Sequence, residues 1–210
     1  MLKTIIAPGS AYSQNDTVYP NSVRFGVEVS YPIRGIFEPE VEQYEASIDF
    51  EFYPNWFGVF EGGMLMVDIK REDFEYYTNG HFFRSGINFN MLGNEVLDEN
   101  DMVYIGLRYG YSKQSQGAEN VIVSDGYWDE EPFVTSVDEV DFNVHWGELV
   151  AGVKTELFTN LFIGWSLRAR LKVSATEETM IEPYRIGGFG RGDNKTAIDF
   201  NYSISYRIPF

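Results

Sequence analysis

The last fourteen residues of the chain, "AIDFNYSISYRIPF" (197–210), alternate between apolar and polar side chains almost without interruption. Because successive side chains of a β-strand point to opposite faces, this alternation predicts a strand with one wholly apolar face. The fold class depends on what that face contacts. It continues to the last residue and consists of Ile198, Phe200, Tyr202, Ile204, Tyr206, Ile208 and Phe210.

The same period of two recurs along the chain, whereas helical spacing is scarce. The first alternating segment carries its apolar face up to Tyr31. Around Glu61, Gly62 and Gly63 the alternation is blurred, and we expect a β-bulge there. Eight strands are expected, over residues 22–31, 43–53, 57–69, 81–91, 102–112, 144–157, 161–173 and 197–210.

The connections between these strands alternate in length. We expect tight turns at "PNW" (54–56) and "FTN" (158–160), because Pro and Asn suit the backbone of a turn. The connections after the first, third, fifth and seventh strands are expected to be long, with an acidic loop over residues 113–140. Short turns at one rim and long loops at the other are typical of outer-membrane barrels. The pattern predicts an all-β, eight-stranded antiparallel up-and-down transmembrane β-barrel.

The composition excludes several classes of protein. A net charge of −16 argues against a nucleic-acid partner, which would require a basic surface. The chain has no cysteine, so it has neither a disulfide framework nor a thiolate metal site. No apolar run approaches the roughly 18 residues of a spanning helix, but a spanning barrel requires no such run. Its 210 residues suit one domain.

The polar faces of the strands carry acids and bases in equal numbers, although the whole chain is strongly acidic. A water-exposed surface would share that acidic excess, whereas a closed lumen needs its charges paired. We therefore predict a plugged lumen rather than an ion path, in which Arg168, Arg170 and Lys172 pair with carboxylates such as Glu45, Asp49 and Glu51. The predicted lumen charge network consists of Arg24, Glu28, Glu45, Asp49, Glu51, Glu61, Arg84, Arg108, Glu148, Lys154, Glu156, Arg168, Arg170, Lys172, Asp199 and Arg207.

The apolar faces are predicted to contact lipid. Their strands are long enough for the about 9–11 residues that cross a bilayer at a tilt. The alternative is a soluble, lipocalin-like carrier, in which Trp165 and Phe200 would lie inside and Arg170 outside. Aromatic residues near the turns and the C-terminus match an interfacial girdle, namely Tyr53, Trp56, Phe158 and Phe210.

The final strand also resembles the C-terminal signal of bacterial outer-membrane proteins, with Tyr206, Ile208 and Phe210 on its apolar face. This resemblance implies recognition by the barrel-assembly machinery. From about Val23 onward the chain resembles a family of small outer-membrane barrels from Bacteroidota. The resemblance is carried by "GVEVSYPIRGIF", "MVYIGLRYGYS", "HWGELVAGVKTELFTNLFIGWSLRARL", "IGGFGR" and "NYSISYRIPF".

The family resemblance implies an eight-stranded barrel, location in the bacterial outer membrane and no assigned reaction. Residues 21–210 would form the barrel. Residues 1–20 would be a remnant of an export signal or a flexible N-terminus, because the apolar segment around Ile5 and Ile6 is too short for a complete signal peptide.

Few residues have the chemistry of a catalytic site. His81 lies near Ser85 and His145 near Glu148, so the alternative function is a lipid A-modifying enzyme of the outer leaflet. Neither spacing identifies a nucleophile–base pair, and we predict no catalytic residue, cofactor or metal ligand. "IGGFGR" (186–191) is not a nucleotide-binding loop, since no helix is expected after it.

The predicted function is therefore a structural or protein-interaction role in the outer membrane. The expected partners are membrane lipids and lipopolysaccharide, the barrel-assembly machinery, and an outer-membrane lipoprotein or larger envelope complex. The aromatic side chains of the acidic loop are expected either to contact a partner protein or lipopolysaccharide or to pack as a lid, and they are Tyr127, Trp128 and Phe133.

Overall fold

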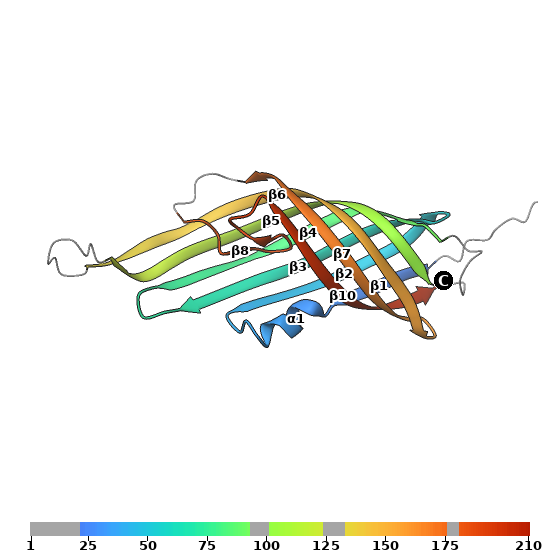
Figure 1. The fold of residues 1–210 in the computed structure, drawn as a ribbon, viewed down its shortest axis with the longest axis horizontal. Coiled ribbons are helices and arrows are strands. Elements are labelled where there is room, and N and C mark those ends of the chain that lie inside the picture. Colours follow the sequence, from blue (N-terminus) through green and yellow to red (C-terminus); the bar gives the residue numbers. More distant parts are fainter. Residues whose placement is uncertain (1–21, 93–100, 124–132, 176–180) are drawn as a thin grey trace, which may run out of the picture.

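The computed structural model describes residues 22–92, 101–123, 133–175 and 181–210. Eight antiparallel strands close into a barrel in the order β1-β10-β7-β6-β5-β4-β3-β2 (Figure 1). This confirms the predicted fold class. The barrel strands are β1 (Ser22–Glu28), β2 (Val41–Tyr53), β3 (Trp56–Lys70), β4 (Glu75–Asn90), β5 (Met102–Val123), β6 (Phe133–Phe158), β7 (Leu161–Ala175) and β10 (Thr196–Pro209).

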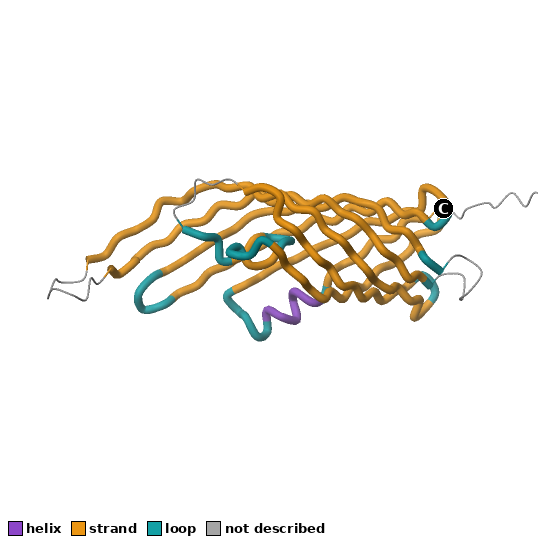
Figure 2. The backbone as a smooth tube through the Cα atoms, turned by 45° about the horizontal axis from the view of Figure 1, so that its top comes forward, coloured by secondary structure: helices purple, strands orange, loops and turns teal. Residues whose placement is uncertain are grey.

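Three short elements lie in the connections at the rim opposite the C-terminus. Helix α1 (Ser30–Gly35) follows β1, and the small hairpin of β8 (Arg185–Ile186) and β9 (Gly190–Arg191) lies between β7 and β10. Figure 2 shows α1 at the wall of the barrel and the β8–β9 segment within its outline. No helix in the described residues is long and apolar enough to cross a membrane.

The polarity of the barrel is apolar outside and charged inside. Phe200 is 50% exposed on the outer wall, whereas Arg170 is only 2% exposed in the lumen. Trp165 and Tyr202 are also exposed, which overturns the lipocalin-like alternative. At the end of the barrel that carries the short turns, Tyr53, Phe158 and Phe210 are exposed, and the Trp56 ring packs against Phe89 at a tilt of 49° with centroids 4.9 Å apart.

The two tight turns are built alike, from a repeated Glu-x-aromatic-x-Asn pattern. Asn55 and Asn160 have φ of 64° and 65°, a conformation that Asn tolerates better than most residues. The carboxylate of Glu51 accepts a hydrogen bond from the amide of Asn55 at 2.8 Å, and Glu156 accepts one from Asn160 at 2.5 Å. Each pattern also contains a register shift, so the two turns share one design.

Several boundaries predicted at the opposite rim are wrong. The third connection is a short turn after β3, because β4 begins already at Glu75. Residues 113–123 and 133–143 are strand rather than loop, since β5 and β6 continue as a long hairpin beyond the barrel (Figure 1). The polar sequence of these residues led to the prediction of a loop, but a hairpin surrounded by water needs no apolar face. Tyr31 belongs to α1 and is buried, so the first strand ends before it.

The expected bulge at Glu61-Gly62-Gly63 is also absent, since β3 keeps an unbroken register with β2 and β4 over these residues. The alternation is blurred because Gly63 occupies an inward position and has no side chain. A Cβ at Gly63 would lie 2.5 Å from the Phe82 ring, so the glycine makes room for that ring. Farther along β3, apolar residues occupy both faces: Leu65 and Val67 are buried, while Met64 and Met66 are exposed.

Candidate functional site in the barrel lumen

The centre of the lumen is organised around Arg84, whose side chain is fully buried. Its Nε atom lies 2.8 Å from Glu61 Oε2, and its guanidinium contacts Glu45. Its Nη1 atom is 3.5 Å from Glu148 Oε2. Arg84 on β4 therefore joins carboxylates from β2, β3 and β6, which are not all neighbours in the barrel wall.

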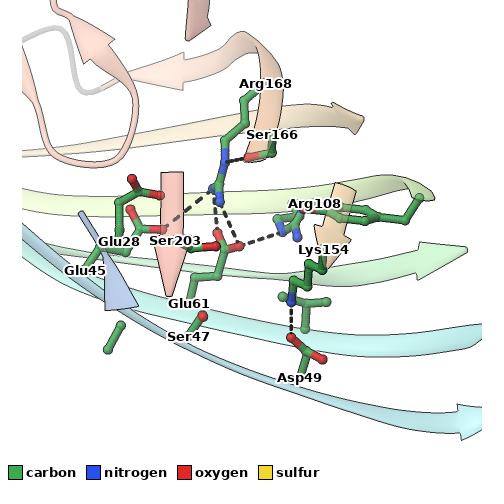
Figure 3. A pocket seen from close by; sticks show the side chains of 13 residues that line it. Glu28, Glu45, Ser47, Asp49, Glu61, Arg108, Lys154, Ser166, Arg168 and Ser203 are labelled. Carbon is green, nitrogen blue, oxygen red and sulfur yellow. Dashed lines mark hydrogen bonds and ion pairs between the residues drawn. The ribbon is translucent and has the colours of Figure 1, made fainter. Parts of the chain in front are cut away.

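Glu61 contacts two further arginines in this group besides Arg84. Arg168 donates to both of its oxygens at 2.8 and 3.2 Å, and Arg108 Nε lies 3.1 Å from it (Figure 3). Arg168 also reaches Glu148 at 3.3 Å. Charge-assisted contacts of this kind are strong, and their mutual compensation allows many charges to be buried together.

A second charge group lies nearer the C-terminal end of the barrel. Asp49 accepts a hydrogen bond from Arg24 Nε at 2.5 Å and is also bonded to Lys154 (Figure 3). The Arg24 guanidinium lies 4.8 Å from the centroid of the Phe57 ring and 5.6 Å from that of Phe162, within cation–π range. Asp49 on β2 is thus shared between a cation on the adjacent strand β1 and one on β6, which is not its neighbour in the barrel wall.

The space left between these charges is small. A cavity of about 20 Å³ lies between the two charge groups and is lined by Glu45, Glu61, Arg108 and Lys154, among others (Figure 3). A volume of this size has room for about one water molecule. The charged side chains themselves therefore fill the lumen at this level.

The β8–β9 segment fits into the lumen above the charge groups, and basic side chains of the wall hold its backbone. Arg84 donates to the carbonyl of Gly188 at 3.2 Å, and Arg170 donates to that of Phe189 at 2.9 Å. Lys172 donates to the carbonyl of Gly192 at 2.5 Å. We call residues 184–192 the plug.

Apolar contacts complete the seat of the plug. The ring of Phe189 is fully buried and meets Trp146 edge-on, with centroids 5.9 Å apart. Ile186 belongs to the same buried cluster as Phe82 and Trp146. Gly188 has φ of +73° and lies against the Phe82 ring, where an added Cβ would be 2.5 Å from a ring carbon. The glycines of "IGGFGR" therefore serve close packing inside the barrel.

The predicted pairing of the β7 cations with carboxylates is confirmed for Arg168 and Arg170, although mostly with other carboxylates than those named, and is wrong for Lys172. Arg168 lies 3.7 Å from Glu45, but its shorter contacts are with Glu61 and Glu148. Arg170 lies 3.3 Å from Glu148, and Lys172 contacts the plug rather than a carboxylate. The reason is height along the barrel axis, because Asp49 and Glu51 lie toward the end with the short turns.

The remaining predicted network residues lie at the two ends of the lumen. Glu51 and Glu156 are half-buried and hold the tight turns, and Arg207 Nε donates to Asn160 Oδ1 at 3.1 Å. Glu28 accepts a hydrogen bond from the amide of Tyr202 at 3.1 Å. Glu28, Glu51 and Glu156 thus cap backbone amides, and Arg207 lies 3.9 Å from Glu156 beside the second tight turn.

At the other end, Asp199 is half-buried and accepts hydrogen bonds from Arg34 at 2.5 and 3.1 Å and from Tyr31 at 3.2 Å. Asp199 also lies 3.6 Å from Arg170, which connects this rim of the barrel with the central group.

The two histidines lie on the outer wall and have no catalytic arrangement with the predicted partners. The Tyr109 hydroxyl is 2.6 Å from His145 Nδ1, and the Tyr111 ring packs against the same imidazole with centroids 4.9 Å apart. Glu148, its proposed acid, is on the opposite face of β6, in the lumen. His81 is exposed and lies four residues from Ser85 on one strand, a separation of about 13 Å.

The structure describes the predicted assembly residues and only one of the three predicted loop residues. Tyr206, Ile208 and Phe210 are exposed on the outer wall at the end of β10, where it pairs with β1 to close the barrel. Tyr127 and Trp128 lie outside the described residues, and Phe133 begins β6.

The sequence reasoning missed the plug and the aromatic side chains that receive it. A signal was present on β6, where Phe142, Val144 and Trp146 share the parity of the lumen-facing Glu148. Apolar side chains on an otherwise charged face indicate that another part of the chain covers them. The inward amide of Gln114 is a further missed contact, because it accepts a hydrogen bond from the plug amide of Gly187 at 3.2 Å.

Comparisons with known proteins agree with this fold. A family model described as a domain of unknown function (DUF6048) matches residues 3–210. No curated protein matches the chain in sequence. A major outer membrane protein from Thermus thermophilus has a similar structure with a TM-score of 0.55 at 10% identity, covering 90% of this chain and 98% of that one.

Two further solved structures are similar at lower scores. The attachment invasion locus protein Ail of Yersinia pestis has a TM-score of 0.42 at 11% identity, covering 90% of this chain and 97% of its own. CarO of Acinetobacter baumannii has a TM-score of 0.42 at 10% identity, covering 91% and 98%. The fold assignment rests on the closed strand order and on the Thermus structure.

Proposed function

We propose that this chain, which belongs to the DUF6048 family, is an integral outer-membrane protein whose lumen is closed to solutes and whose outward-projecting strands bind a partner. The observation that carries the proposal is the inverted polarity of the barrel. Its outer wall is apolar from Val103 to Tyr111 on β5, and the outward side chains turn polar at Lys113. That apolar length matches the about 9–11 residues a tilted strand needs to cross a bilayer.

The proposed closure of the lumen has two layers. The charge groups around Arg84 and Asp49 fill the middle of the barrel, and the plug covers them from one side. An eight-stranded barrel leaves an interior that side chains can fill. A solute path would require both layers to move, which argues for a structural role of the lumen.

We predict that the purified protein conducts no ions when it is reconstituted into a planar lipid bilayer. A variant with residues 184–192 replaced by a short Gly-Ser linker should also stay closed, because the remaining cavity holds about one water molecule. Single-channel recording at both voltage polarities is the measurement. Stepwise currents from the wild-type chain would contradict the proposed closure. A gel-migration assay should show that the barrel is folded in both proteins. Each should migrate faster before heating than after it.

The long hairpin of β5 and β6 supports the proposed binding role. These strands have 22 and 26 residues, compared with 13 to 16 in β2, β3, β4, β7 and β10, and the hairpin projects beyond the barrel (Figure 1). Pairing of β6 with β7 starts at Val144, so in the described part of the chain residues 134–143 have β5 as their only strand neighbour. An unpaired strand edge offers backbone donors and acceptors to another chain.

We predict that shortening this hairpin abolishes partner binding without unfolding the barrel. The variant would join the strands at the Gln116–Val140 pair through a two-residue Asn-Gly turn. A photo-cross-linking residue would replace Val140 in the wild-type and in the shortened chain, and both would be produced in cells. The comparison position is His81, which is exposed on the outer wall of the barrel. A cross-linked species from Val140 in the wild type should disappear on shortening. An unchanged set of adducts would refute a binding role of the hairpin.

A further inference from the structure

The barrel wall has a gap on the side opposite the hairpin, because β1 is much shorter than its neighbours. β1 pairs with β2 only up to Val27↔Ala46 and with β10 only up to Glu28↔Ser203. Both neighbouring strands continue beyond these pairs toward the rim with the plug, to Val41 and to Thr196. Helix α1 follows β1 directly and occupies the place between them (Figures 1 and 2).

Polar side chains of this segment satisfy backbone groups that a longer β1 would have paired. Arg34 donates to the carbonyl of Phe200 at 2.8 Å, and the carboxylate of Glu28 accepts from the amide of Tyr202 at 3.1 Å. The Arg34 pair with Asp199 ties the helix to the same strand. Two backbone groups of β10 at the gap are therefore hydrogen-bonded, as exposure to hydrocarbon would require.

The outer side of the same segment is strongly apolar. Ile36 and Phe37, directly after α1, are 76% and 83% exposed, and Ile33 within α1 is also exposed. A groove of about 300 Å³ lies between this segment and β2, and its lining is mixed, with apolar Ile36, Val41 and Tyr44 beside polar Glu42 and Gln43. Ile33, Ile36 and Phe37 therefore form an exposed apolar patch. Such a patch marks a surface that contacts another apolar surface.

We propose that Ile33, Ile36 and Phe37 insert into the acyl chains of the outer leaflet. The inference rests on the proposed membrane location. It is carried by continuity with the lipid-facing wall on both sides of the gap. The outward apolar face of β10 extends to Ile198, and that of β2 extends to Tyr44 before the exposed Glu42.

Contacts with β10 and β2 hold α1 at the height of the lipid-facing wall. Arg34 is bonded to the backbone of Phe200, and Tyr44 is shared between the groove and the lipid-facing wall. The apolar outer wall of the barrel is thus interrupted where β1 ends, and the apolar side chains of the α1 segment continue it. Short apolar segments at the boundary of the acyl chains are stabilised by the area that they bury there.

Site-directed spin labelling tests the proposal, because the chain contains no cysteine. Single variants Ile36→Cys and Phe37→Cys would be labelled with a nitroxide and reconstituted into phosphatidylcholine–phosphatidylglycerol vesicles. Leu107→Cys, on the exposed apolar wall, is the lipid control, and Lys113→Cys, on the polar outer surface, is the water control. Power saturation would compare collisions with oxygen, which partitions into the bilayer, and with a water-soluble nickel chelate.

We expect the oxygen-to-nickel collision ratio at residues 36 and 37 to match that at Leu107 and to exceed that at Lys113 several-fold. A ratio equal to that at Lys113 would place the segment in water and overturn the inference. Shielding from both reagents would reveal a second copy or another protein on the patch, and would also overturn it. A water-like ratio at Leu107 would instead refute the membrane location itself, so the two failures are distinguishable.

Discussion

Replacing Arg84 with methionine is expected to lower the free energy of unfolding by about 3–5 kcal/mol, the range seen when one partner of a buried ion pair is removed. Arg84 is fully buried, and its guanidinium is the shared partner of Glu45, Glu61 and Glu148. Methionine fills a similar volume but leaves three carboxylates with one cation fewer. The variant should also lose the hydrogen bond to the plug carbonyl of Gly188.

Urea titration of the reconstituted protein, followed by tryptophan fluorescence, measures this effect. Arg71→Met is the matched control, since Arg71 pairs with Glu40 at 2.8 Å on the exposed rim and such pairs contribute about 0–1 kcal/mol. Adding Glu45→Gln to Arg84→Met should restore part of the stability, because it removes one uncompensated charge. Equal losses from Arg84→Met and Arg71→Met would show that the lumen charges are solvated and that the lumen is open.

Much of the fold could be predicted from the period of two. The parity of Arg168 and Arg170 against Trp165 and Leu171 assigns the inner and outer faces of β7 directly. Strand ends were predictable only where an apolar face stops at the membrane. β5 and β6 continue into water with polar residues on both faces, and no periodicity distinguishes such a hairpin from a loop.

The composition of the lumen was predictable, but its pairing was not. Parity alone selects Arg84, Glu61 and Glu148 as inward residues. Which of them touch depends on the tilt of the strands and on contacts across the barrel, as the Arg84–Glu148 pair between the non-adjacent strands β4 and β6 shows. Glu51 illustrates the same limit, because its inward parity is compatible with a charge group but its height places it at a turn.

The plug could not be predicted by periodicity, because it owes its shape to the lumen around it. Its carbonyls at Gly188 and Phe189 are bound by Arg84 and Arg170, which are also paired with Glu148. The charge groups and the plug are therefore one structure, because each of these two arginines contacts both a lumen carboxylate and a plug carbonyl. Loss of these arginines should weaken both layers of the closure, whereas loss of the plug alone should leave the lower layer in place.

Substituting alanine for Gly188 is expected to displace the plug while the barrel stays folded. A residue with a Cβ at φ +73° costs about 1–2 kcal/mol, and overpacking against the Phe82 ring adds about 1–3 kcal/mol. Phe82 is buried and has little freedom to move away. Hydrogen exchange at the amides of Gly187 and Phe189 should therefore accelerate at least about tenfold, with strand amides unchanged.

Gly147→Ala is the matched control, because a Cβ there meets no atom within 4 Å. Unchanged exchange in the plug of Gly188→Ala would show that these residues are not seated against Phe82, and a loss of protection throughout the strands would show that the plug is required for the barrel itself.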